Sequence, residues 1–227
     1  ELYIHIPFCV KKCAYCDFLS GPAGEKEKEE YVKMLVDEIR NCPDTVQNYR
    51  VISIFFGGGT PSLLTGEQIG RLMDTVREIF TLDEDAEITM EMNPGTVTEE
   101  KLRKYRQAGV NRLSIGLQSV NDEELRLLGR IHTYEEFREA YYLARANGFS
   151  NINVDLISAI PGQTVESWRR TLEQVMALSP EHISAYSLIL EEGTIFYKKY
   201  VEDEAKEGPK LPDEDAERQM YWDTETL

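Results

Sequence analysis

Residues 2–18 read LYIHIPFCVKKCAYCDF, a short apolar run followed at once by three closely spaced cysteines. The apolar part, 2–7, predicts a strand. Cys9, Cys13 and Cys16 then place three thiols on one short loop, in the spacing C-x-x-x-C-x-x-C. A cubane iron–sulfur cluster is usually held by four thiolates, so three thiolates leave one iron open. Because catalytic metal centres keep an open coordination position, the loop predicts a 4Fe–4S cluster that contacts a small-molecule ligand.

Two other uses of these cysteines have to be weighed. A zinc site needs four ligands, commonly two C-x-x-C pairs, and only His5 or the distant Cys42 could supply the fourth one here. Disulfides are disfavoured because nothing indicates secretion and three clustered cysteines leave an odd thiol. We therefore expect a cluster. Cys42 is then expected to be a small buried residue, and His5 to make a structural hydrogen bond.

Composition limits the classes of partner. The chain has 227 residues, of which 41% are hydrophobic, enough to bury a substantial core within one domain. Its net charge of −16 argues against nucleic acid and against an anionic membrane surface as partners. The longest apolar runs have the length of strands, so we expect no integral membrane segment. No signal peptide or transit segment is recognised, and cysteines clustered as metal ligands fit a reducing cytoplasm.

Six β-rich segments alternate with amphipathic helical ones. Near-continuous apolar runs such as 51–56 (VISIFF) are expected where other elements cover both faces of a strand. Alternation of strands and helices predicts a parallel sheet. From the residues alone, an open doubly wound sheet and a closed or partial barrel remain alternatives. The expected strands are 2–7, 51–56, 86–92, 111–117, 151–157 and 182–190.

Several residues mark where the intervening helices begin and end. Thr65 with Gln68, and Thr133 with Glu136, have the spacing of a capping box. Other expected N-caps are Thr98 and Asn121, and expected helix ends are Gly109, Gly129 and Gly148.

The last thirty or so residues differ in composition from the rest. We expect residues 198–227 to form a charge-rich solvated loop followed by a helix from about Pro212, outside a core at 1–197. Met220, Tyr221 and Leu227 would form the packing face of that helix. The sequence starts within a strand pattern and stops within a helical one, so we expect both ends to be cut from something longer. The tail would lead into a missing C-terminal domain.

Polar residues or glycines stand at the ends of several expected strands. The run 57–61 (GGGTP) follows the second one, and its glycines let backbone amides approach a ligand, although a tight turn explains such a run equally well. Glu91 ends the third strand and can accept hydrogen bonds from an amine or a sugar hydroxyl; a surface acid is the alternative. Asp155 lies inside an apolar run, where a charge is costly unless it is paired or bound to a ligand.

Five segments resemble the radical S-adenosylmethionine (SAM) superfamily. They are YIHIPFCVKKCAYCDF at 3–18, GGTP at 58–61, EMNP at 91–94, LGRIH at 128–132 and DLISAIPGQT at 155–164. The resemblance implies an α/β fold, a partial (β/α)6 barrel of parallel strands whose chemistry gathers at the carboxyl ends of the strands. It also implies that the open iron binds the amino and carboxylate groups of SAM. An electron from the cluster then cleaves SAM to methionine and a 5′-deoxyadenosyl radical.

The same resemblance implies individual contacts to SAM. Arg130 offers a fork of donors that suits a carboxylate or a ribose. The resemblance implies that the methionine end of SAM contacts Gly58, Gly59 and Thr60, and that its ribose contacts Asp155. It implies further contacts to SAM from Glu91 and Gln118. Tyr3 and Tyr15 would pack around the cofactor. For His132 we expect a capping or surface role at least as readily as a role in the site.

Within the superfamily, the segments look most like the branch that holds oxygen-independent coproporphyrinogen III dehydrogenase and the HemW-type heme chaperones. The dehydrogenases carry a further cysteine two places after the third ligand, where this chain has Phe18. Phe18 therefore favours the chaperone type, which would bind heme and deliver it to an acceptor hemoprotein. The heme-associated motif H-N-x-x-Y-W of that type is absent from these residues and would lie beyond Leu227.

Two alternatives to a chaperone stay open. One is a dehydrogenase that oxidatively decarboxylates the propionates of coproporphyrinogen III, with the same cluster and SAM ligands. The other is a radical SAM enzyme with an unrelated substrate. A porphyrinogen or heme would be the substrate or cargo, and the resemblance implies an electron donor such as flavodoxin or ferredoxin.

Overall fold

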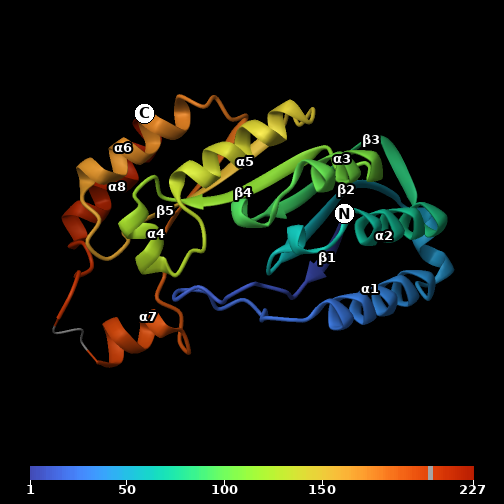
Figure 1. Cartoon of the computed structure of the whole chain (residues 1–227), viewed down its shortest axis with the longest axis horizontal. Coiled ribbons are helices and arrows are strands. Elements are labelled where there is room, and N and C mark those ends of the chain that lie inside the picture. The colour runs from blue at the N-terminus through green and yellow to red at the C-terminus, as the bar shows by residue number, and fades with distance from the viewer. Residues whose placement is uncertain (204–206) are drawn as a thin grey trace.

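Six parallel strands form one curved sheet in the computed structural model, which describes residues 1–203 and 207–227 (Figure 1). The order in the sheet follows the chain, and every neighbouring pair is parallel. The first and the last strand each have one partner, so in the described part of the chain the sheet is not closed. This confirms the expected partial barrel. The strands are β1 (Leu2–Ile6), β2 (Arg50–Gly58), β3 (Thr81–Met92), β4 (Arg112–Gln118), β5 (Ile152–Ser158) and β6 (His182–Ser187).

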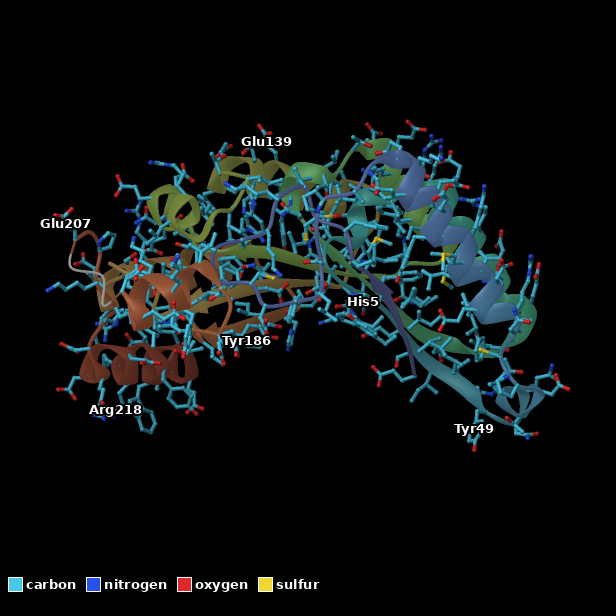
Figure 2. The ribbon with its side chains drawn as sticks, turned by 90° about the horizontal axis from the view of Figure 1, so that it is seen from below. His5, Tyr49, Glu139, Tyr186, Glu207 and Arg218 are labelled. Carbon is cyan, nitrogen blue, oxygen red and sulfur yellow. The ribbon has the colours of Figure 1, made fainter. Side chains whose placement is uncertain are left out.

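Helices connect successive strands and cover the outer face of the sheet. In Figure 2, Glu139 of α5 marks this outer side, whereas His5 and Tyr186 lie on the opposite, concave side. The helices are α1 (Glu25–Arg40), α2 (Gly66–Ile79), α3 (Glu99–Ala108), α4 (Asp122–Leu128), α5 (Tyr134–Ala146), α6 (Val165–Met176), α7 (Ile195–Tyr197), the π-helix η4 (Lys198–Glu202) and α8 (Glu214–Thr226). Short 3-10 turns cover Asp44–Asn48, Pro61–Leu63 and Pro94–Thr96. Among the described residues, no helix is both long and apolar enough to cross a membrane.

The two faces of the sheet differ in polarity. Alternate side chains of a strand point to opposite faces of the sheet. In β4, the side chains on the helix-covered face are Leu113, Ile115 and Leu117, and all three are fully buried. The alternate positions Ser114, Gly116 and Gln118 face the concave side. The expectation that both faces of β2 are covered was wrong at its amino end, where Ile52 is 65% exposed. The concave side is therefore the side on which polar groups can meet a ligand.

The strand boundaries differ from the predicted ones where backbone pairing continues further or stops earlier than expected. β2 extends through its glycines because Gly57 and Gly58 still pair with β1. β3 begins at Thr81, five residues before the expected start at 86. β6 ends at Ser187, before the expected 190, because its partner β5 ends at Ser158 and turns away at Ala159, whose φ is 58°. These differences leave the order of the elements unchanged.

The predicted helix ends are largely confirmed. Thr65 and Thr133 both form complete capping boxes. Thr98 and Asn121 cap α3 and α4 through their side chains. Gly109 and Gly129 end these helices in the left-handed conformation, whereas Gly148 follows the actual C-cap of α5, Asn147.

We expect Thr65→Ala to lower the free energy of unfolding by about 1 kcal/mol, because it removes the acceptor for the Gln68 backbone amide at the start of α2. Urea denaturation of the cluster-free protein measures the change. The matched control is Thr45→Ala, because Thr45 is exposed and makes no side-chain hydrogen bond among the described residues. An equal loss in both variants would contradict the capping role.

The tail differs in part from the expectation. Residues 198–202 form a π-helical turn that continues α7, not a loop, and α8 begins at Glu214 with Asp213 as its N-cap. Of the expected packing face, Met220 is buried, whereas Tyr221 and Leu227 are more than half exposed. The buried Trp168 of α6 donates a hydrogen bond to the Met220 carbonyl, 3.0 Å away, and so joins α6 to α8. The expected charged loop includes 204–206, which lie outside the described residues. The division between a core at 1–197 and a tail at 198–227 stays a prediction.

Candidate functional site

One cavity at the carboxyl ends of the strands brings the predicted residues together. It has a volume of about 460 Å³ and opens on the concave side of the sheet. Its wall contains these predicted site residues: Cys9, Cys13, Cys16, Tyr15, Gly58, Gly59, Thr60, Glu91, Gln118, Arg130 and Asp155. They come from the loop after β1, from the ends of β2, β3 and β4, from the middle of β5 and from the turn after α4. The arrangement is the one expected of a β/α barrel, where ligands bind at the carboxyl ends of the strands.

Tyr3 is the predicted residue that does not line this cavity. It lies at the start of β1 and is 58% exposed. Its hydroxyl is 3.1 Å from Nδ1 of His5, and its ring stacks on that of Phe55. Packing of Tyr3 around a cofactor stays a prediction.

The cysteine loop is held by elements that are distant in sequence. The Ala14 amide donates to the Leu128 carbonyl at the end of α4, and the Ala14 carbonyl accepts from the Phe196 amide of α7, both at 2.9 Å. Gly129 packs on the loop, where a Cβ atom on it would make an ordinary van der Waals contact, 3.4 Å from the Ala14 nitrogen. Figure 1 shows the cysteine loop running alongside α4 and α7. The loop is therefore fixed by tertiary contacts and not only by its own sequence.

The glycine run has a packing role that its sequence did not reveal. Gly58 has a φ of +113°, and a Cβ atom on it would lie 2.5 Å from the His5 ring. The amides of this run are already used: Gly59 donates to Ile6, Thr60 donates to Phe8 and Gly58 donates to Glu91. A ligand at this strand end therefore meets carbonyl oxygens, which are acceptors and suit an amino group.

Two carboxylates, Glu91 of β3 and Asp155 of β5, line the cavity close enough for their charges to interact. Burial, together with the nearby Asp155 charge, raises the pKa of Glu91 to about 7, although the Gly58 amide 3.1 Å away opposes the shift. Burial likewise raises the pKa of Asp155, against hydrogen bonds from Ser114 at 2.9 Å and Asn153 at 2.7 Å. Burial is the largest cause of both shifts, although the charge of Arg112 opposes the shift at Asp155. A cationic ligand beside the two carboxylates would favour their ionised forms.

Arg130 supplies a guanidinium to the cavity wall. Its Nη2 donates to the Gly116 carbonyl at 2.7 Å, and its Nη1 lies 3.8 Å from the Cys13 sulfur. Its Nε is buried without a hydrogen-bond partner among residues 1–203 and 207–227. The guanidinium as a whole lines the cavity wall, where its donors suit a ligand carboxylate or hydroxyl. Nearby, Gln118 has a φ of 78°, a strained backbone conformation of the kind that often marks functional sites.

These observations fit the implied cofactors. In a cubane cluster each thiolate binds a different iron, so the three sulfurs have to surround a space and do not have to converge on one point. SAM carries a carboxylate for Arg130, an amino group for backbone carbonyls and a sulfonium charge for the acidic pair. The residues present therefore fit a 4Fe–4S cluster with SAM beside it.

The possible fourth ligands of a zinc site lie elsewhere. His5 uses both ring nitrogens, with the Tyr3 hydroxyl and the Leu19 carbonyl as partners, which confirms its structural role. Cys42 follows α1 and contacts the Glu38 carbonyl with its sulfur. Cys42 is only partly buried, so the expectation of a buried position was wrong. Neither residue is part of the cavity wall.

Two features of the site were missed from the sequence. The cavity wall also includes residues at and after the end of β6, namely Tyr186, Leu188 and Ile189. The signal for them in the sequence was the period-2 alternation along 182–190. His132 is buried, not on the surface, and does not cap a helix. Burial and the neighbouring Arg130 charge lower the pKa of His132 to about 3. The burial of His132 depends on packing against β4, which its local sequence does not encode.

Comparison with known proteins gives consistent similarities. The Radical SAM superfamily profile matches residues 3–175. The chain is 44% identical to "Heme chaperone HemW" of Escherichia coli K12 over 98% of this chain and 56% of that protein. It is 41% identical to the Haemophilus influenzae protein of the same name, again over 98% and 56%. The chain thus spans little more than half the length of these curated relatives.

A solved structure shows the same fold. Coproporphyrinogen III oxidase (HemN) from Escherichia coli, described as a radical SAM enzyme, superposes with a TM-score of 0.87 at 34% identity. The match covers 99% of this chain and 51% of that one.

Proposed function

Because the chain belongs to the radical SAM superfamily, we propose that its cavity holds a 4Fe–4S cluster on Cys9, Cys13 and Cys16, with SAM beside it. The observation that carries the proposal is the single cavity that unites the three thiols with an acidic pair and the guanidinium of Arg130. When bound, the cluster supplies an electron to SAM.

Different residues of the cavity wall would bind different groups of SAM. The guanidinium of Arg130 would bind the carboxylate of SAM, and backbone carbonyls at the end of β2 would accept hydrogen bonds from the amino group of SAM. Glu91 and Asp155 face the cationic and hydroxyl groups of the ligand and lose their mutual repulsion when it binds. Tyr15 and Gln118 complete the wall and exclude water.

The wider role that we propose is that of a HemW-type heme chaperone acting in the cytoplasm. Two observations support it: the relatives at 41–44% identity carry that name, and Phe18 occupies the place where the dehydrogenase branch has a cysteine. Phe18 is 64% exposed beside the cysteine loop and so offers an apolar surface next to the cavity. Heme, an acceptor hemoprotein and an electron donor such as flavodoxin or ferredoxin would be the partners.

The second candidate function is oxidative decarboxylation of coproporphyrinogen III. It is supported by the structural match to HemN, which covers nearly the whole chain. Both functions use the same cofactors, so the cavity alone does not separate them.

The test uses the full-length protein, loaded with cluster and SAM. Hemin and coproporphyrinogen III are supplied in separate experiments. We expect a shifted Soret band with hemin and no vinyl-bearing product from coproporphyrinogen III. Formation of protoporphyrinogen would show that the protein acts as the dehydrogenase and would contradict the chaperone function.

A further inference from the structure

The chain has three histidines, and in the structure they differ in what their ring nitrogens can bind. His5 uses both nitrogens for hydrogen bonds within the protein. His132 is buried, so neither of its nitrogens is open to a ligand from solvent. His182, at the start of β6, is exposed, and only its Nδ1 has a hydrogen-bond partner in the described part of the chain. Its Nε2 is therefore the one histidine nitrogen in that part that an incoming metal centre can reach.

A polar network fixes the tautomer of His182. Nδ2 of Asn153 donates to Asp155 at 2.7 Å and to Ser114 at 2.8 Å. Because a carboxylate accepts, this orientation of the amide directs Oδ1 of Asn153 toward Nδ1 of His182, 2.5 Å away. An amide oxygen also only accepts, so Nδ1 carries the proton and Nε2 keeps its lone pair. Metal-binding histidines are commonly oriented in this way, by an acceptor that holds the other ring nitrogen.

The position of His182 connects this nitrogen to the cavity. In the register of β5 and β6, Asn153 pairs with His182 and Ile157 pairs with Tyr186. His182, Ser184 and Tyr186 alternate along β6 and so share the concave face of the sheet. Tyr186 lines the cavity and lies about 13 Å along the strand from His182. Figure 2 shows Tyr186 on the concave side, and its ring is 60% exposed.

The surroundings of His182 decide which metal centre it suits. No group of three Cys, His, Asp or Glu side chains in the described part of the chain could hold a metal ion by itself. A heme brings four nitrogens of its own and needs only an axial ligand from the protein. Its flat apolar ring also suits a strand face that carries an exposed aromatic side chain.

We propose that Nε2 of His182 is an axial ligand to the iron of a heme bound on the open face of β6. The inference rests on the proposed heme chaperone function and adds to it a site on this part of the chain. His182 does not line the SAM cavity, so heme binding there leaves the cluster ligands free.

The test is a hemin titration of the full-length protein, followed by absorption and electron paramagnetic resonance (EPR) spectroscopy. The variants are His182→Ala and, as a control, Ser184→Ala. The Ser184 hydroxyl donates to the same Asn153 oxygen at 3.0 Å, so this control perturbs the polar network but keeps the proposed ligand nitrogen. We expect the wild type and the control to give the spectrum of a histidine-ligated ferric heme. His182→Ala should lose that spectrum and bind hemin about tenfold or more weakly. Added imidazole should restore the spectrum of His182→Ala.

Cluster content and SAM cleavage, measured in the same samples, should be equal in all three proteins, which shows that the site fold is intact. An unchanged heme spectrum and affinity in His182→Ala would overturn the proposed ligand and leave the chaperone function standing. A wild-type protein that binds no heme would overturn both.

Discussion

Replacing Cys13 with serine should abolish the iron–sulfur absorbance of the anaerobically reconstituted protein. Cys13 is one of three thiols around the cavity, and its loop is anchored to α4 through the neighbouring Ala14. Two thiolates leave two irons of a cubane without a protein ligand, and a serine hydroxyl is a poor substitute for a soft thiolate. Iron and acid-labile sulfide assays, together with the absorption spectrum, measure the loss.

Cys42→Ser is the matched control for this variant. Cys42 lies beyond the end of α1 and outside the cavity wall, so its replacement should leave the cluster content at the wild-type level. A full cluster in Cys13→Ser, or a lost cluster in Cys42→Ser, would remove the basis for the ligand assignment.

Glu91→Gln should raise the stability of the cofactor-free protein at pH 8 but weaken the binding of SAM. The pKa of Glu91 is raised from 4.5 to about 7, chiefly by burial. Between these values the folded protein holds a proton that the unfolded chain has released, so stability falls as pH rises through this window. Below pH 4.5 Glu91 is protonated in both the folded and the unfolded state, so it causes no loss of stability there. Removing the carboxylate should therefore stabilise the cofactor-free protein at pH 8 by about 3 kcal/mol and leave it unchanged at pH 4.

Urea denaturation at the two pH values measures this difference. Glu84→Gln is the control, because Glu84 of β3 is exposed and makes no ion pair or side-chain hydrogen bond among the described residues. For Glu84→Gln we expect no gain in stability at pH 8. The affinity of the cluster-loaded Glu91→Gln protein for SAM should fall about tenfold, because a charged hydrogen-bond acceptor is lost. A variant that is less stable at pH 8, or that binds SAM as well as the wild type, would show that Glu91 serves only the fold.

The part of the site that could be predicted consists of residues whose type alone is unusual for their place. Three cysteines on one loop and an acid inside an apolar strand indicate chemistry without any knowledge of the fold. The alternation of elements also indicated a parallel sheet, but whether that sheet is open or closed depended on the family resemblance. Strand number and curvature arise from packing across the whole chain, which local patterns do not encode.

The parts that could not be predicted depend on contacts between distant segments. The glycine run after β2 seemed to offer amides to a ligand, yet its amides bond to Ile6, Phe8 and Glu91. The burial of His132 and the tautomer of His182 likewise depend on neighbouring strands. The contribution of residues 186–189 to the cavity was missed because the segment was assigned wholly to a strand.

EPR spectroscopy of the reduced protein, with and without SAM, tests the cofactor site most directly. The proposed site holds one 4Fe–4S cluster per chain, with an open iron that binds SAM. We therefore expect the signal of a reduced 4Fe–4S cluster in the anaerobically reconstituted protein and a clear change in that signal when SAM is added. A protein that holds zinc or no metal, or a cluster signal that SAM leaves unchanged, would contradict the site described here.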